Sequence, residues 1–554
     1  MTQEIKVSLP SGKTLTVAYG TRVHDLLGEP EFAHSAHPVV AALVNNEPTS
    51  LSYKIEVDSR LEPITAESDQ GVRALRRSLC FLLTIAVHEL FPDRSLIIGH
   101  SLGDSYYYHF DGLESVSDED LDRVRRRMRE IVAKELPVHR TVVSYTEALD
   151  YFQSRSQTAT VLLLKYRNEN KIPVYVCGEF MDLSYGPLVP NTGLLTTFDL
   201  ARYDPGFLLR YPPQSDPEKL GPFADDPLLF SIYQEYKSWG KILNLHCVGN
   251  LNDLVASKEI RDFIPIAEAL HNKKIAEIAD RIHGRRGNVR IVLIAGPSSS
   301  GKTTFAKKLA IQLRVTGFNP VAISLDDYFV SRERTPRDAN GDLDFEALEA
   351  IDVELLNRHL LSLFAGESVE IPEFDFKSGE RKPRARELRL PERGMLVMEG
   401  IHGLNERLTP RIPRNQKYTI YVSALTQLNL DDHNRISTTD NRLLRRIVRD
   451  YNFRGYSALT TLGRWQSVRR GEDRNIFPYQ NNADSAFNSA LDYELAVLKT
   501  YAEPLLMSVK PFHREYAEAN RLLIFLNNFA PIPPTLVPDD SILREFIGDS
   551  AFTY

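Results

Sequence analysis

One stretch, residues 289–304, constrains the second half of this chain more than any other part of the sequence. It reads VRIVLIAGPSSSGKTT. Residues 289–295 are mostly apolar and β-branched, as in a buried parallel strand, and residues 305–317 have helical apolar spacing with Gly317 as the stop. Between them, residues 296–303 fit G-x-x-x-x-G-K-[ST] at every fixed position. A strand, a glycine loop and a helix in this order form the context in which such a loop binds phosphate.

This loop predicts a nucleoside triphosphate site. Gly296 and Gly301 allow the backbone to turn so that several N–H groups face one phosphate chain, and the helix N-terminus adds partial positive charge. Lys302 can reach the β- and γ-phosphates, and the Thr303 hydroxyl can hold Mg²⁺. The alternative is a chance glycine turn, which the complete motif and its context disfavour. The predicted nucleotide-binding residues of the loop are Gly296, Ser298, Ser299, Ser300, Gly301, Lys302, Thr303 and Thr304.

The composition narrows the class of protein. The chain has 554 residues, 42% of them hydrophobic and 25% charged, which is ordinary for a globular protein of three or four domains. A net charge of −7 gives no electrostatic case for nucleic-acid binding by the whole chain, although a local basic patch stays open. The three scattered cysteines form neither a disulfide framework nor a zinc pattern. Because no signal core or membrane-spanning run is recognisable, we expect a soluble cytoplasmic protein.

Residues 3–66 predict a small β-rich domain. Two alternating segments surround a Pro-Ser-Gly turn, and a second strand–turn–strand pattern follows. The segments 6–13 and 43–47 resemble a TGS domain, the ubiquitin-like module of threonyl-tRNA synthetases and some GTPases. This resemblance implies a β-grasp fold for residues 1–66, and an unrelated small β fold is the alternative.

Residues 70–210 resemble the α+β editing-type domain of threonyl-tRNA synthetase, mainly through segments 104–111 and 186–192. In that family, a His-x-x-x-His pair and a Cys-x-x-x-His pair form a metal-type site. A Phe, Ile or Leu side chain can neither coordinate a metal nor transfer a proton. We therefore expect a scaffold or binding platform without editing hydrolysis. The four corresponding positions here hold Phe81, Ile85, Ser184 and Leu188.

Two histidines and a basic run in this region can each be interpreted as structural or as functional. His88 and His100 lie close to these positions, and we expect structural histidines rather than ligands. The basic run at 123–129 could contact RNA phosphates, but its acidic helical surroundings favour a solvated charged face.

Residues 211–288 are predicted to connect the two halves of the chain. A Pro-rich loop is followed by an amphipathic helix over residues 262–284, whose apolar face includes Ile266. This connection is too short for the catalytic domain of a class II synthetase, so aminoacylation is poorly supported.

Beyond the glycine loop, two more apolar runs end in carboxylates. Asp326 and Asp327 follow residues 320–325, and Glu399 ends the run that starts at Met395. Ligands of open α/β sheets lie beyond the carboxyl ends of the strands, so Asp326 is placed to face a transferred phosphate. A carboxylate there can accept a hydroxyl proton or orient Mg²⁺. The alternative is a turn or N-cap aspartate, especially for Asp327.

The motif order over residues 289 to about 500 resembles the uridine kinase/phosphoribulokinase family, above all uridine–cytidine kinases. It runs from the glycine loop through Ser-Leu-Asp-Asp-Tyr, Met-Glu-Gly-Ile and Arg-Arg-x-x-Arg-Asp. The resemblance implies an α/β kinase domain with a parallel sheet over residues 289–510, in which Lys302 and Asp326 are catalytic and Thr303 and Glu399 hold the metal. It also implies that the acceptor is held by Asp326, Tyr328, Glu349 and Phe374, with Gly379 in place of a base-contacting histidine.

Four arginines at i, i+3, i+4 and i+7 share one face of a predicted helix. Asp440 and Asp450 neutralise this group only in part, so we expect a triphosphate to supply the missing anion. The resemblance implies a closing lid in which Arg445 and Arg449 are catalytic and Arg442 and Arg446 bind nucleotide. The alternative is a solvated helix face.

Together these features predict a multidomain protein. It consists of a β-grasp (TGS-like) domain, an α+β synthetase-like domain, a linker, an α/β P-loop kinase and an extension over residues 511–554 that packs, with a short helix at 541–547. The predicted activity is transfer of the γ-phosphoryl group of ATP, with Mg²⁺, to the 5′-hydroxyl of uridine or cytidine. A different nucleoside or a sugar phosphate is one alternative, and a nucleotide-gated tRNA- or RNA-binding regulator is another. We also expect a homo-oligomer, with any RNA contact made by the N-terminal half.

Overall fold

The chain folds into two compact units, each built from three separate segments. Unit 1 consists of Met1–Ser257, Gln427–Ile436 and Leu506–Ala530, and unit 2 of Lys258–Thr426, Ser437–Leu505 and Pro531–Tyr554. Segments of the predicted kinase part and of the C-terminal extension therefore belong to unit 1, and the predicted domain boundaries stay predictions. A computed structural model describes residues 3–33, 37–112, 115–214, 216–337, 341, 343–375, 378–382 and 386–553.

The first part of unit 1 is a five-stranded sheet in the order β2-β1-β5-β3-β4. The two predicted strand pairs are confirmed, since β1 is antiparallel to β2 and β3 is antiparallel to β4, while β1 and β5 are parallel. Gly12 turns the first hairpin with a φ of 88°. The β-grasp and TGS assignments of this part stay predictions. The strands are β1 (Glu4–Ser8), β2 (Thr14–Ala18), β3 (Val39–Val44), β4 (Glu47–Thr49) and β5 (Ser59–Thr65).

The rest of unit 1 is α+β. The helix α2 (Asp69–Leu90) begins at the N-cap Ser68, whose hydroxyl accepts from the N–H of Gly71, and its apolar face fills the core. Two antiparallel sheets, β10-β9-β8 and β11-β12-β7-β6, complete this part. The strands are β6 (Leu96–Ser101), β7 (Ser105–Phe110), β8 (His139–Ser144), β9 (Lys171–Cys177), β10 (Phe180–Asp182), β11 (Asp199–Tyr203) and β12 (Gly206–Arg210), and the helices between them are α3 (Asp118–Ala133), α4 (Tyr145–Ser154) and α5 (Thr158–Lys165).

Within the predicted linker and the predicted C-terminal extension, three helices of unit 1 were not predicted from the sequence. They are α6 (Pro227–Ile242), α7 (Val248–Ser257) and α14 (Tyr516–Leu526). The Pro-rich segments that precede α6 and follow α14 concealed them, because prolines inside a window break the apolar period that marks a helix. Parts of the predicted linker and of the predicted extension are therefore helical segments of unit 1.

Unit 2 is organised around a five-stranded sheet in the order β14-β19-β13-β20-β21, and every adjacent pair is parallel. All residues of β13 are buried, which explains its continuous apolar sequence. The predicted strands after 289, 320 and 395 are therefore confirmed as members of one parallel sheet. The strands are β13 (Ile291–Ala295), β14 (Asn319–Ser324), β19 (Gly394–Glu399), β20 (Lys417–Ser423) and β21 (Ser485–Asn488).

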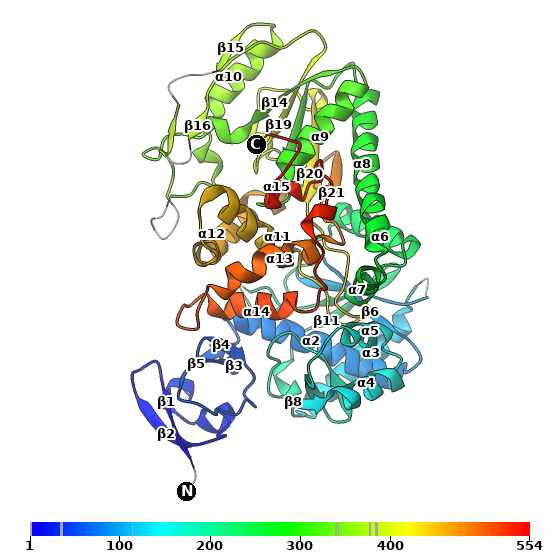
Figure 1. Cartoon of the computed structure of the whole chain (residues 1–554), viewed down its shortest axis with the longest axis vertical. Helices are drawn as coiled ribbons and strands as arrows, with labels where there is room; N and C mark the ends of the chain where they lie inside the picture. The colour runs from blue at the N-terminus through cyan, green and yellow to red at the C-terminus, as the bar shows by residue number, and fades with distance from the viewer. Residues whose placement is uncertain are drawn as a thin grey trace. The chain divides into compact units, whose positions relative to one another are not determined.

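Helices cover this sheet, and α9 packs against β14, β19 and α8 (Figure 1). The predicted helices at 262–284 and 305–317 are confirmed as α8 and α9. The prediction for Ile266 is wrong, because its side chain is 50% exposed and Phe263 and Ala267 face the core instead. None of the helices within the described ranges combines the length and apolarity needed to cross a bilayer. The remaining helices are α8 (Ile260–Gly284), α9 (Lys302–Val315), α10 (Val353–Phe364), α11 (Thr438–Arg449), α12 (Ala458–Asn475), α13 (Glu494–Met507) and α15 (Arg544–Ile547), with two small hairpins, β15–β18 (Val369–Ile371, Arg386–Leu388) and β16–β17 (Phe374–Asp375, Glu380–Arg381).

Candidate active site

The loop between β13 and α9 has a backbone that only glycine tolerates at two positions. A Cβ atom at Gly296 would lie 1.9 Å from the carbonyl oxygen of Val422 on the neighbouring strand. Gly301, the N-cap of α9, has a φ of 82° and supplies no side-chain hydrogen bond to the helix. The N-terminus of α9 therefore keeps backbone donors and a partial positive charge for an anion. This is the geometry that the sequence motif predicts.

Two carboxylates occupy backbone donors of this loop. The N–H of Ser298 donates to Glu472 over 2.9 Å. The N–H and the hydroxyl of Thr304 both donate to Glu545 of α15, over 3.1 and 2.7 Å. Lys302 donates to the carbonyl of Pro297 over 3.2 Å. Donors at both ends of the loop are thus bonded to carboxylates, which are anionic partners as a phosphate would be.

The carboxyl ends of β14 and β19 bring Asp326, Glu399 and Lys302 together. Burial raises the pKa of Asp326, while the charges of Lys302, Arg454 and Arg449 act in the opposite direction. Burial also raises the pKa of Glu399, to about 7, against the lowering effect of Lys302. The hydroxyl of Thr303 lies 3.4 Å from a carboxylate oxygen of Glu399. Two carboxylates and a cation thus share one poorly solvated edge of the sheet, as predicted for a site at the strand ends.

These side chains fit Mg²⁺ and a triphosphate. The hydroxyl of Thr303 and the carboxylates of Glu399 and Asp326 supply oxygen donors, the type of ligand that Mg²⁺ prefers. Burial raises the pKa of both carboxylates, and a divalent cation bound between them would favour their charged form. Within the described ranges, no group of three or more His, Cys, Asp or Glu side chains is arranged to hold a metal by itself, at this site or at another.

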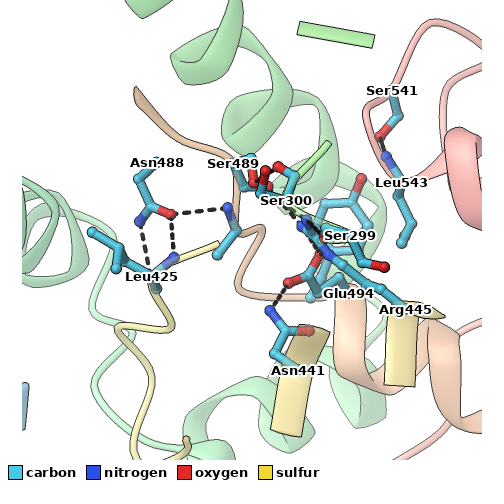
Figure 2. Close-up of polar contacts among 12 residues, drawn as sticks. Ser299, Ser300, Leu425, Asn441, Arg445, Asn488, Ser489, Glu494, Ser541 and Leu543 are labelled. Carbon is cyan, nitrogen blue, oxygen red and sulfur yellow. Dashed lines mark hydrogen bonds and ion pairs between the residues drawn. The ribbon is translucent and has the colours of Figure 1, made fainter. Parts of the chain in front are cut away.

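The expectation that only Asp440 and Asp450 neutralise the four arginines is wrong. Arg445 is fully buried and pairs with Glu494, and it also donates to Ser489 and to the carbonyl of Ser299 (Figure 2). Arg442 pairs with the buried Glu472. These carboxylates are 49 and 30 residues away in the sequence, so the local pattern could not indicate them.

Arg446 and Arg449 are the more accessible members of the group. Arg446 donates to the hydroxyl of Ser298 over 2.7 Å and pairs with Asp450, as does Arg449. Arg442 and Arg445 therefore brace the loop through the carbonyls of Ser298 and Ser299, while Arg446 and Arg449 lie at its open side. The catalytic assignment of Arg445 and Arg449 and the nucleotide-binding assignment of Arg442 and Arg446 stay predictions.

The predicted acceptor residues lie in two different environments. Tyr328 is fully buried and its hydroxyl lies 3.2 Å from a ring nitrogen of His359, and Phe374 packs in the same core cluster. Glu349 is exposed and pairs with Arg407 over 3.1 Å. The backbone of Gly379 has a φ of 76°, and the side chain of Arg332 lies over it. Of Tyr328, Phe374 and Glu349, only Glu349 presents a polar group to solvent.

The four positions that carry metal-type ligands in synthetases are structural here. Phe81, Ile85 and Leu188 are buried in the core of unit 1, and the Ser184 hydroxyl donates to the carbonyl of Gly186. Phe81 packs edge-on against Phe180 with ring centroids 5.4 Å apart. The core therefore fills the space that ligands would need.

The two histidines and the basic run are also partnered. His100 is buried, bonds to the carbonyl of Ser101, and has a pKa lowered to about 3 by burial, while His88 contacts Arg155. In the basic run, Arg125 pairs with Asp199 and Arg127 with Glu130. These pairs favour the charged-face interpretation over a free phosphate-binding surface.

Sequence reasoning missed Glu346, Arg454, Glu472 and Glu545, which all act on the site. Burial raises the pKa of Glu346 to about 7, with Glu472 as the next cause, and Arg454 acts on Asp326 from the turn after α11. The sequence signal for Arg454 was its position, five residues after Arg449 and directly beyond the arginine-rich helix. Glu545 gave no signal, because nothing local ties a C-terminal glutamate to the glycine loop.

Comparisons with known proteins cover the two parts of the chain separately. Residues 291–496 match the model of the phosphoribulokinase/uridine kinase family. The N-terminal region is similar to threonine–tRNA ligases, with 39% identity over 166 residues to that of Carboxydothermus hydrogenoformans and 35% over 196 residues to that of Rubrobacter xylanophilus. These matches cover 30% and 35% of this chain but only 26% and 30% of the ligases, so the chain spans less than a third of either relative.

Solved structures of kinases also match this chain. A possible uridine kinase from Bacillus stearothermophilus aligns with 19% identity over 36% of this chain and 89% of its own, at a TM-score of 0.25. A putative fructose transport system kinase from Silicibacter sp. TM1040 aligns with 18% identity over 38% of this chain and 98% of its own, at a TM-score of 0.26.

Proposed function

Because residues 291–496 form a domain of the phosphoribulokinase/uridine kinase family, we propose that this protein is an ATP-dependent kinase of a small alcohol. The proposed acceptor is the 5′-hydroxyl of a nucleoside, uridine or cytidine in the first place. The observation that carries the proposal is the meeting of Lys302, Asp326 and Glu399 at the strand ends beside a glycine loop with oriented donors.

Each of these residues has a role in phosphoryl transfer. The N–H groups of the loop and the N-terminus of α9 bind the phosphate chain, and Lys302 stabilises the negative charge that develops on the transferred group. Asp326 accepts the proton of the attacking hydroxyl, a task that its raised pKa favours. Thr303 and Glu399 would hold Mg²⁺, which neutralises phosphate charge when bound. Arg446 and Arg449 would close over the nucleotide and exclude water.

The acceptor is the open part of this proposal. Glu349 is exposed and can accept hydrogen bonds from ribose hydroxyls if it leaves Arg407. Arg407 beside it would also suit a phosphate group, so a sugar phosphate is the alternative acceptor. Tyr328 and Phe374 would shape the acceptor site from within the core rather than contact a base directly.

The test is ADP release from Mg-ATP across nucleosides and sugar phosphates, with the product mapped by phosphorus NMR. We expect a 5′-monophosphate with uridine or cytidine. The variant Asp326→Asn removes the carboxylate that acts as the catalytic base, so it should lower kcat by about 100-fold or more. Asp327→Asn is the matched control, because this neighbouring carboxylate is not assigned to the reaction, and it should keep most of the activity. Equal losses in the two variants would remove Asp326 from its role.

Similarity of the N-terminal region to threonine–tRNA ligases favours a second candidate, a nucleotide-gated RNA-binding regulator. In this candidate the P-loop domain acts as a switch. It predicts ATP-dependent binding of tRNA and no turnover with any small acceptor. A tRNA filter-binding assay with and without ATP separates the two candidates, since a kinase needs no tRNA.

A further inference from the structure

A cavity of about 520 Å³ lies within unit 1, and all of its lining residues belong to that unit. Its walls come from α2, the segment 183–187, β4, β9 and α14, and α14 lies beside β4 (Figure 1). Ser184 lines it, whereas Phe81, Ile85 and Leu188 do not. The volume is within the range of about 300–1,000 Å³ that is usual for small-molecule sites. The cavity is thus separate from the filled core that replaces the metal-type site.

The charges around this cavity do not balance. Three acidic side chains line it, Glu47, Glu169 and Glu518. Glu169 pairs with Arg167, and Glu518 pairs with both Arg73 and Arg521. No carboxylate pairs with Arg77, Arg140 or Lys171 in the portion of the chain that the structure describes. The six basic side chains of the lining are Arg73, Arg77, Arg140, Arg167, Lys171 and Arg521.

Arg77 is the best placed of these cations to bind an anion. Its Nη2 donates to the carbonyl of Pro187 over 3.3 Å, and its buried Nε has no hydrogen-bond partner among the described residues. The guanidinium lies against Gly186, where a Cβ atom would come within 2.6 Å of Cζ. Burial and the nearby Arg73 lower the pKa of Arg77 to about 10, the mark of a cation that lacks a counter-charge. A guanidinium fork in this state is suited to a phosphate or carboxylate.

The other walls suit an apolar, flat body. Tyr53, Tyr175 and Pro173 line the cavity, and the half-exposed Val142 and Ile524 face it from opposite ends of the sequence. Aromatic and proline walls hold planar groups through stacking and dispersion contacts. Three uncompensated cations match the double charge of a phosphate monoester better than the single charge of a carboxylate.

We propose that this cavity binds a small organic phosphate, with its phosphate group on Arg77 and its apolar body between the tyrosine wall and α14. The site is independent of the kinase reaction proposed above. It also explains why α14, from the C-terminal third of the chain, is tied to α2 by the Arg73–Glu518 pair over 3.0 Å. The helix closes a site that the synthetase-like part alone would leave open.

The test is titration calorimetry of the full chain with phenyl phosphate as the probe, and with benzoate and inorganic phosphate for comparison. We expect phenyl phosphate to bind at least about 10-fold more tightly than either comparison ligand, because only it has both the dianion and the flat body. The same binding should persist in Lys302→Ala, which removes the lysine of the glycine loop.

Arg77→Met should weaken phenyl phosphate binding by about 10-fold or more, whereas Arg126→Met should not. Arg126 is the matched control, because it is exposed on α3 and does not line the cavity. The variant Ile524→Trp keeps Arg77 but fills the cavity, so it should also abolish binding of phenyl phosphate. It tests the proposal even if Arg77→Met does not fold. Absence of binding at about 1 mM probe, binding lost in Lys302→Ala, or binding unchanged in both cavity variants would each overturn the proposal.

Discussion

Arg445 and Arg449 lie one turn apart on α11, yet their surroundings give them different roles. Arg445 has no exposed side-chain surface and is held by Glu494 and Ser489, which leaves no donor directed at a ligand. Arg449 is partly exposed, bonds to Asp450, and acts on the charge of Asp326. Identical side chains in one sequence pattern thus divide into a buried brace and a group that can reach a phosphate.

This difference predicts opposite results for two matched substitutions. Arg445→Met should lower the free energy of unfolding by about 3–5 kcal/mol, because Glu494 would be left buried without its partner. Arg449→Met should change stability by less than about 1 kcal/mol and lower kcat by at least about 10-fold. Urea unfolding and ADP release measure the two effects. A stable but inactive Arg445→Met protein would contradict the structural role of Arg445 and would support its catalytic assignment.

The sequence could predict the loop residues but not their countercharges. Gly296 and Gly301 are identifiable because their chemistry is local, with one close backbone approach and one left-handed φ. Glu472 and Glu494 are not identifiable, because the fold alone brings them to the arginines. The expectation that a triphosphate must neutralise the arginines therefore missed two carboxylates, while the binding of a triphosphate stays a prediction.

At the scale of elements, strands were predicted better than helices. The strands β13 and β19 are buried on both faces, so their sequences are continuous apolar runs, whereas β14 lies at the edge of the sheet and is partly exposed. The helices α6 and α14 border Pro-rich segments, and their apolar faces were not separable from loop sequence. The short helix predicted at 541–547 is confirmed as α15, with Gly548 at its end.

The helix α15 carries a consequence for nucleotide binding. Glu545 accepts from both donors of Thr304, at the N-terminus of α9 where a phosphate would bind. Removing its charge should relieve this competition, so Glu545→Gln should lower the KM for ATP by about 3–10-fold. Steady-state kinetics at saturating acceptor measures the effect.

The control for this variant is Asp549→Asn. Asp549 lies in the same tail but is 94% exposed. Its KM for ATP should match that of the original protein. A KM that rises in Glu545→Gln would mean that the carboxylate supports the loop instead of competing with phosphate.

At the scale of the whole molecule, the chain returns to unit 1 through residues 427–436. His433 lies 2.7 Å from a carboxylate oxygen of Asp182, and Asn429 donates to the carbonyl of Ile98 over 2.7 Å. The N–H of Ile98 donates in turn to the carbonyl of Asp432. A segment from the middle of the kinase sequence is therefore part of the synthetase-like core, which no local pattern could have revealed.

This insertion makes the stability of unit 1 depend on pH. Burial lowers the pKa of His433, but the carboxylates of Asp182, Asp431 and Asp432 outweigh burial and raise it to about 9, despite the nearby His88. Since the folded pKa exceeds the unfolded value of 6.5, this contribution is complete below about pH 6.5 and is lost as the pH rises through 9. Burial raises the pKa of Asp431 to about 7, which acts in the same direction between about pH 4 and 7.

We expect the free energy of unfolding of unit 1 to fall by roughly 2 kcal/mol between about pH 6.5 and 9. His433→Asn should remove most of this slope, whereas His139→Asn, at an exposed position of β8, should leave it. Chemical unfolding followed at several pH values measures the slope. An unchanged slope in His433→Asn would exclude this histidine as its source.

The central claim is that the P-loop site transfers a phosphoryl group to a small alcohol, and neither hydrolyses ATP nor binds it without turnover. The most direct measurement is the rate of ADP formation from Mg-ATP with and without uridine in the same preparation. We predict that uridine, or another nucleoside or sugar phosphate in its place, raises the rate by at least about 10-fold, because the hydroxyl competes with water only when it is bound. An ADP rate that no acceptor changes, beside tight ATP binding, would contradict the kinase and leave the RNA-binding regulator.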